Sequence, residues 1–153
     1  MTKLSETLAA KGITLPPVAG PFGAYVPAKQ IGKLIYVAGQ LPMREGKLIA
    51  SGQVPTRCSV DRAKEGARQC VINALGAVQS LLGSVDSIAG VVRVGAFVSS
   101  ETSFTEQPKV ANGASEFLLD ILGDAGKHVR AAVGVNTLPL DAAVEIEFIF
   151  HIA

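Results

Sequence analysis

The sequence predicts an α+β fold in which two helices cover one face of a β-sheet. Residues 60–82 and 108–122 repeat apolar side chains at intervals of three and four, the spacing of a buried helical stripe. Residues 144–152 instead alternate, with apolar side chains on one face and mostly polar groups on the other. The predicted order is hairpin, helix, strand, helix, strand, strand, and two helices can cover only one face of such a sheet.

The first 16 residues are expected to form a helix and an arm ahead of one domain at residues 17–153. A short helix is predicted at 2–11, where Thr2 can cap the start and Gly12 ends the run. Proline and glycine interrupt the chain that follows, which favours an extended arm. A chain of 153 residues is long enough for one domain with a proper core.

Turn and cap residues delimit the other elements. Gly32-Lys33 is the expected turn of the first hairpin. Gly83 ends the long helix, and the second helix has Pro108 in its first turn and Gly123 after its last. Strands are predicted at residues 24–29, 33–39, 47–50, 91–98, 130–135 and 144–152.

The last two strands each carry a charged group. Arg130 alternates with the apolar residues Ala131 and Val133, and Glu145 alternates with Val144 and its apolar neighbours. We therefore expect both charges on the face of the sheet opposite the helices. Something must cover that face, and a second copy of the chain is the economical choice. The sequence thus predicts a homo-oligomer.

The composition excludes several classes of function. Net charge is +1 with no cluster of Lys and Arg, which argues against nucleic acid as the main partner. Two Tyr, six Phe and no Trp leave few surfaces for stacking bases. No apolar run approaches the ~18 residues of a membrane span. The N-terminus lacks the pattern of a signal peptide, so a cytoplasmic location is expected.

Neither a metal nor a cofactor is predicted. Cys58 and Cys70 have no metal or redox spacing, and we expect two reduced, partly buried small side chains. His128 and His151 are the only histidines, too dispersed from the cysteines for a zinc site. No glycine-rich loop matches a phosphate-binding pattern.

Several motifs occur in a defined order along residues 17–153. They are Gly20-Pro21-Phe22, Tyr36-Val-Ala-Gly-Gln40-Leu-Pro42, Asn73-Ala-Leu, Val94-Gly-Ala-Phe-Val98, Asn112, and Arg130 through Glu147 with Leu138-Pro139. On these motifs the chain resembles the Rid family (YjgF/YER057c/UK114). The N-terminal helix, Asn112-Gly-Ala-Ser115 and the segment from Gly126 to Val135 resemble a longer branch of that family.

The resemblance implies a chorismate-mutase-like α+β fold with a mixed sheet. It also implies a homotrimer, whose sheets form a barrel-like core with the helices outside and a cleft at each subunit interface. The implied activity is cofactor-independent hydrolysis of enamines and imines, such as 2-aminoacrylate, to a keto acid and ammonia. Some family members have been described as ribonucleases or translation inhibitors.

The resemblance also assigns candidate site residues. Arg130 matches the family arginine, and a guanidinium offers two parallel donors to a substrate carboxylate. Glu145 matches a carboxylate that orients water and accepts its proton. Gly39 resembles a position where the backbone comes close to the ligand, and Asn112 resembles a polar helix residue near the cleft.

Three positions depart from the family pattern. Phe22, Ala38 and Ala132 stand where the family usually has Tyr, Ser and Cys. Each change removes a polar group from the expected cleft, which favours either a larger or more apolar ligand or the loss of deaminase activity. A non-catalytic protein that binds small carboxylates is therefore an alternative, and a ribonuclease is disfavoured by the charge balance.

Two further residues have open roles. Glu147 shares a face with Glu145 and could take its place or pair with Arg93. His128 precedes Arg130 by two residues, at the rim of the expected cleft or on the plain surface.

Overall fold

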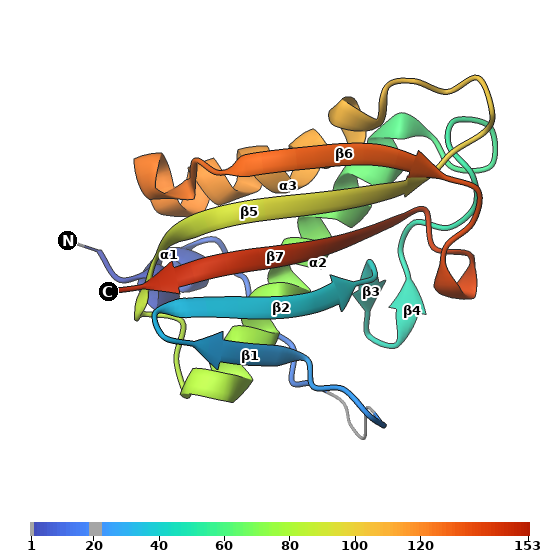
Figure 1. Cartoon of the computed structure of the whole chain (residues 1–153). Helices are drawn as coiled ribbons and strands as arrows, with labels where there is room; N and C mark the ends of the chain where they lie inside the picture. Colours follow the sequence, from blue (N-terminus) through green and yellow to red (C-terminus); the bar gives the residue numbers. More distant parts are fainter. Residues whose placement is uncertain (1, 19–22) are drawn as a thin grey trace.

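The computed structural model describes residues 2–18 and 23–153. A five-stranded sheet has the order β1-β2-β7-β5-β6, and β3 and β4 form a separate two-stranded hairpin (Figure 1). The elements are α1 (Leu4–Ala10), β1 (Ala28–Ile31), β2 (Leu34–Gln40), β3 (Met43–Arg44), β4 (Lys47–Leu48), α2 (Val60–Leu82), β5 (Ile88–Ser99), α3 (Gln107–Leu122), the 3₁₀ turns η1 (Gly123–Gly126) and η2 (Pro139–Asp141), β6 (Val129–Val135) and β7 (Val144–Ile152).

The sheet is mixed. The pairs β1–β2, β2–β7 and β5–β7 are antiparallel, whereas β6 runs parallel to β5. A parallel pair needs a crossover connection, and α3 supplies it between β5 and β6. This connection leaves β6 at one edge of the sheet.

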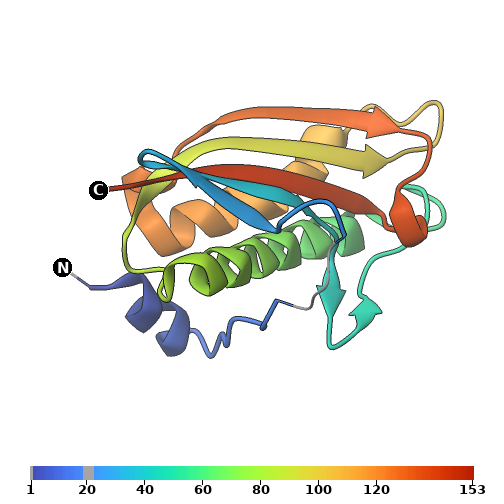
Figure 2. The same ribbon diagram turned by 60° about the horizontal axis from the view of Figure 1, so that its bottom comes forward.

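Helices α2 and α3 lie side by side on the same face of the sheet (Figures 1 and 2). Helix α2 packs over β2 and β7, and α3 packs over β5 and β6. Between helices and sheet lies the core, in which the stacked rings of Phe148 and Phe150 have centroids 5.7 Å apart. The prediction of an α+β fold with two helices on one face is confirmed.

The two long helices begin and end where their cap residues predict. The Ser59 hydroxyl accepts a hydrogen bond from the Arg62 amide at 3.1 Å, which caps the start of α2. Gly83 has a left-handed φ of 82° at the end of that helix, a conformation that favours glycine. Pro108 lies in the first turn of α3 and Gly123 follows its last residue.

The short helix α1 starts later than expected. Its N-cap is Lys3, whose amide donates to the Glu6 carboxylate at 3.4 Å, so the prediction that Thr2 caps the helix is wrong. Gly12 does follow the end of the helix, with a φ of 72°. Leu4 and Leu8 are buried on one face, which docks α1 beside α3.

Some strands begin or end at residues other than the predicted ones, because pairing with neighbouring strands sets their limits. The predicted strand at 24–29 is β1, which starts only at Ala28, the residue that pairs with Val37 of β2. Strand β5 is longer than the predicted 91–98 because β7 pairs with it from Ile88 onward. The hairpin of β3 and β4 was only half predicted, and its turn has positive φ at both Glu45 and Gly46.

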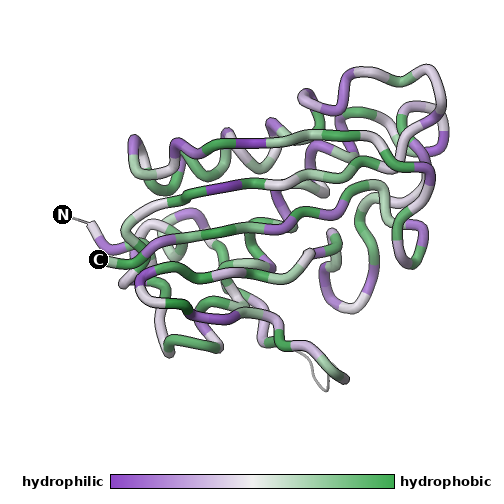
Figure 3. The backbone as a smooth tube through the Cα atoms, in the orientation of Figure 1, coloured by the Kyte–Doolittle hydropathy of each residue, from purple (hydrophilic) through white to green (hydrophobic). Residues whose placement is uncertain are grey.

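Strands β5 and β6 are mostly apolar, and each is interrupted by one hydrophilic stretch (Figure 3). The face of the sheet away from the helices is not covered within the described part of the chain. Val129 and Val133 in β6 are 66% and 46% exposed there. Among the described residues, no helix is both long and apolar enough to cross a bilayer.

Candidate functional site

Arg130 lies on the helix face of the sheet, which differs from the sequence expectation. In β6 it pairs with Val94 of β5, a residue fully buried beneath the helices. Its side chain reaches α3, where Nη1 donates to Asn112 Oδ1 at 2.8 Å and to Ser115 Oγ at 3.1 Å. The alternation along β6 was predicted correctly, but the choice of the face was wrong.

The physical reason is the space between α3 and β6. A Cβ added at Gly134 would come within 2.7 Å of Gln107 Nε2 in α3, so this position on the helix face lies close against the helix. Ala132 shares this face and packs against the core. The bulkier Val129 and Val133 face the uncovered side.

Glu145 lies on the uncovered face of the sheet, as expected. It pairs with Phe97 of β5, and its carboxylate lies directly against Gly39 of β2. A Cβ at position 39 would be 2.2 Å from Glu145 Oε2. The pairing of β2 with β7 is irregular at this point, between Val37 and Gln40. Glycine thus allows the carboxylate to contact the backbone.

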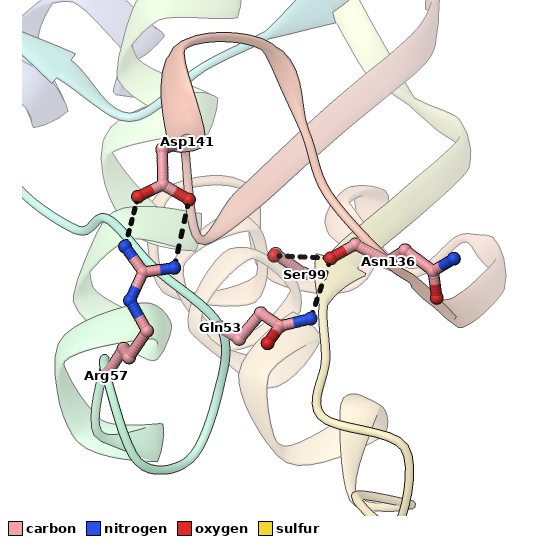
Figure 4. Close-up of polar contacts among 5 residues, drawn as sticks. All are labelled: Gln53, Arg57, Ser99, Asn136 and Asp141. Atoms are coloured by element: carbon pink, nitrogen blue, oxygen red, sulfur yellow. Dashed lines mark hydrogen bonds and ion pairs between the residues drawn. The ribbon is translucent and has the colours of Figure 1, made fainter.

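The loop that leads into β7 is anchored on both sides (Figure 4). The Arg57 guanidinium forms an ion pair with the Asp141 carboxylate. Gln53 Nε2 donates to the carbonyl of Asn136 at 2.8 Å, and the Ser99 hydroxyl contacts the same oxygen at 3.5 Å. These contacts hold the chain a few residues before Glu145.

Glu145 and Glu147 differ in their electrostatic environment. Burial raises the pKa of the Glu145 carboxyl above its ordinary value, and the nearby Glu147 raises it further. Glu147 Oε1 forms an ion pair with Arg93 Nη1 at 3.2 Å. Within residues 2–18 and 23–153, the Glu145 carboxylate has neither a hydrogen bond nor an ion pair. Glu145 is therefore the better placed of the two to accept a proton.

Ala38 lies near this carboxylate pair. Together with Tyr36, Lys29 and Glu147 it lines an open groove of about 550 Å³ on the uncovered face. Ala38 offers no hydroxyl to that groove. Phe22, the remaining candidate residue, lies outside the described residues.

The candidate residues thus form two groups on opposite sides of the sheet. Arg130, Asn112 and Ala132 lie on the helix side at the edge strand. Gly39 and Glu145 lie on the uncovered face. The sheet itself separates the groups, so a single small ligand cannot contact Arg130 and Glu145 of the same chain.

Sequence reasoning missed the contact of Ser115 with Arg130 and left the role of His128 open. Ser115 Oγ lies 2.8 Å from His128 Nε2 and also contacts Arg130. His128 Nδ1 lies 2.6 Å from the carbonyl oxygen of Gly126. Spacing could have found both, since Ser115 follows Asn112 by three on a helix and His128 precedes Arg130 by two near a strand.

A mixed sheet with two helices packed on one face is the architecture of a small α+β protein of the chorismate-mutase-like class. The family model described as "YjgF/chorismate_mutase-like, putative endoribonuclease" matches residues 5–151. The chain belongs to this YjgF/Rid family.

Relatives and a solved structure agree with this membership. "Protein TCP17" of Trypanosoma cruzi is 38% identical over 146 residues, covering 95% of this chain and 91% of the relative. A "2-iminobutanoate/2-iminopropanoate deaminase" of Dermatophagoides farinae is 29% identical over 139 residues, with 90% and 92% covered. The crystal structure of the Agrobacterium tumefaciens protein Atu1372, described as of unknown function, superposes with a TM-score of 0.88 at 40% identity, with 97% and 91% covered.

Proposed function

We propose that the protein is a deaminase of the Rid type, which hydrolyses a small enamine or imine carboxylate to a keto acid and ammonia. The observation that supports the proposal is that two charged groups, Arg130 and Glu145, have no oppositely charged partner among the described residues. Among the described residues, Arg130 has no carboxylate within ion-pair distance and Glu145 has no cation. One relative is described as a deaminase of two imino acids.

A second copy of the chain would bring the two groups together. Arg130 lies on an edge strand, and the uncovered face beside Glu145 carries exposed apolar residues such as Tyr36 and Val133. Burying apolar surface contributes about 25 cal/mol per Å², which favours covering this face. We propose a homotrimer in which Arg130 of one copy and Glu145 of a neighbour line the same cleft.

The chemistry follows from these groups. Arg130 binds the substrate carboxylate, and the imine carbon beside it is already electrophilic. Glu145 accepts a proton from water as the water oxygen bonds to that carbon, and the proton passes to the nitrogen. The hydroxyl group of the resulting carbinolamine then gives its proton to the same nitrogen as the carbon–nitrogen bond breaks, which releases ammonia and leaves a keto acid. A half-buried carboxylate with a raised pKa suits such proton transfer.

The test is hydrolysis of freshly generated 2-aminoacrylate, followed by the release of keto acid. Glu145→Gln should lower kcat by about 10²–10⁴-fold, the usual contribution of a general base. Glu147→Gln is the matched control, because it makes the same change on the same face in a carboxylate already paired with Arg93. A wild-type rate no higher than the uncatalysed rate would overturn the proposal.

A non-catalytic carboxylate-binding protein is the second candidate. It is favoured by Ala38 and Ala132, which leave both parts of the candidate site without the hydroxyl or thiol usual in the family. Calorimetry would then detect 2-oxobutyrate binding that Arg130→Ala abolishes, with no turnover of 2-aminoacrylate. The ribonuclease alternative would require RNA cleavage that Glu145→Gln removes, and the net charge of +1 disfavours it.

A further inference from the structure

We propose that Ser115 and His128 are positioning residues that orient the Arg130 guanidinium, so that its Nε–Nη2 edge is the one presented to a carboxylate. This inference rests on the proposed function for its ligand, although the orientation itself is a property of the free protein. Neither residue contacts the ligand in this scheme. Both act through the guanidinium.

With His128 as a neutral imidazole, the direction of each hydrogen bond in this chain of contacts is determined. The Gly126 carbonyl oxygen can only accept, so His128 Nδ1, 2.6 Å away, carries the proton. In the neutral imidazole Nε2 is then an acceptor, and the Ser115 hydroxyl donates to it at 2.8 Å. The Ser115 oxygen therefore turns a lone pair toward Arg130, whose Nη1 donates to it at 3.1 Å.

The same nitrogen of Arg130 makes a second bond. Nη1 also donates to Asn112 Oδ1 at 2.8 Å, so both of its N–H groups are engaged. Arginine has five N–H donors in a planar fork, and those on Nη2 and Nε remain. These two nitrogens form a parallel pair that matches a carboxylate in two-point contact. Because the protein already binds Nη1, the Nε–Nη2 edge of the guanidinium is the one that remains for the ligand.

The residues of this chain of contacts come from two separate elements. Asn112 and Ser115 lie one turn apart on α3, whereas Gly126 and His128 belong to the segment that leads into β6. Ser115 and His128 are half-buried, while Arg130 is exposed. An exposed arginine usually samples many rotamers, and losing that freedom is costly when a ligand binds. Orienting it before the ligand arrives reduces this cost.

A ligand-free experiment tests the orientation directly. In ¹⁵N-labelled protein, the Nη1 protons of Arg130 should give separate, slowly exchanging NMR signals, identified by their loss in Arg130→Lys. Ser115→Ala and His128→Ala should merge or broaden these signals. Ser115→Thr and His128→Gln should retain them, since the hydroxyl and an acceptor near the Nε2 position are kept. Unchanged signals in both alanine variants would overturn the inference.

Ligand binding gives the second readout. We expect Ser115→Ala and His128→Ala to weaken 2-oxobutyrate binding about tenfold, in line with the loss of a hydrogen bond to a charged group, with recovery in the Thr and Gln variants. Ser103→Ala, in the exposed turn after β5, is the control. If the wild type binds but the alanine variants bind equally well, the positioning role is wrong and the proposed function stands. If the wild type binds no keto acid, the proposed function fails, while the NMR signals still decide the orientation.

Discussion

Arg130 and Glu145 lie on opposite faces of the same sheet, on strands β6 and β7 with β5 between them. Each belongs to its own group of neighbours: Arg130 contacts α3, and the Glu145 carboxylate lies against Gly39. A site that needs both charges therefore needs two copies of the chain. This relationship makes the proposed function testable by mixing variants.

Mixed oligomers should recover activity that neither parent has. Arg130→Ala and Glu145→Gln proteins are each expected to be nearly inactive. After joint unfolding and refolding at equal amounts, about one site in four would combine an intact Arg130 with an intact Glu145 from a neighbouring copy, if copies mix at random in a closed symmetric oligomer. The measurement is 2-aminoacrylate hydrolysis by the mixture. No recovery in demonstrably mixed oligomers would show that the two residues do not share a site.

Covering the open face should depend on its apolar residues. Val133→Asp places a charge where Val133 is 46% exposed, and we expect it to dissociate the oligomer because burying an unpaired charge is costly. Sedimentation velocity measures the change in mass, and activity should fall with it. Leu119→Asp is the matched control, since Leu119 is 41% exposed on α3 and should tolerate the charge without dissociation. Equal effects of both variants would remove this assignment of the interface.

Removing the Glu145 charge should stabilise the fold at neutral pH. Because burial raises the pKa of Glu145, the folded protein holds that proton more tightly than the unfolded chain does. Stability is then lost as pH rises through the folded-state pKa. Glu145→Gln should therefore raise Tm at pH 7, by a gain in unfolding free energy below about 1 kcal/mol for such a partly exposed group.

The stabilisation should vanish in acid, below the ordinary glutamate pKa of about 4.3, where the wild-type carboxyl is also neutral. Glu147→Gln should behave in the opposite way at pH 7, because it breaks the ion pair with Arg93. Thermal unfolding at a series of pH values checks both. A gain for Glu145→Gln that persists unchanged at pH 3 would contradict the charge explanation.

Gly39→Ala should displace the Glu145 carboxylate. The added Cβ would lie 2.2 Å from Oε2, and the carboxylate can move because it ends a flexible side chain. We expect a small change in Tm but a fall in kcat of up to about 10²-fold, as for a catalytic group misplaced by an ångström. In the Glu145→Gln background the same substitution should have almost no further effect on kcat. A crystal structure of the variant would show the new carboxylate position.

Much of the fold could be predicted because its patterns are strong. The stripe of residues 60–82 has the period of a helix and ends at a glycine, and the structure has the helix at Val60–Leu82. The alternation in residues 144–152 correctly placed Phe148 inside and Glu145 outside. The short strands were less accurate, because β1 and β3 are delimited by the partners they pair with and not by their own composition.

The candidate site was predicted as a set of residues but not as an arrangement. Glu145 and Glu147 are equivalent in the pattern, and only the contact of Glu147 with Arg93 distinguishes them. The role of Ser115 depends on α3 crossing β6 at one place, and no local pattern encodes that crossing. Distances between segments far apart in the chain lie outside what periodicity can predict.

Periodicity alone was enough to establish the α+β class, the two long helices and the inward face of β7, because in each case apolar and polar residues are clearly separated. In β6 they are not, since both faces carry apolar residues, with valines on one and Ala132 beside Arg130 on the other. Packing against α3 decides there: Arg130 lies on the same face as Ala132 and Gly134, and its side chain reaches Asn112 and Ser115 of the helix. The contact between two elements far apart in the sequence, which periodicity does not encode, therefore decided the direction of the residue on which the proposed function depends.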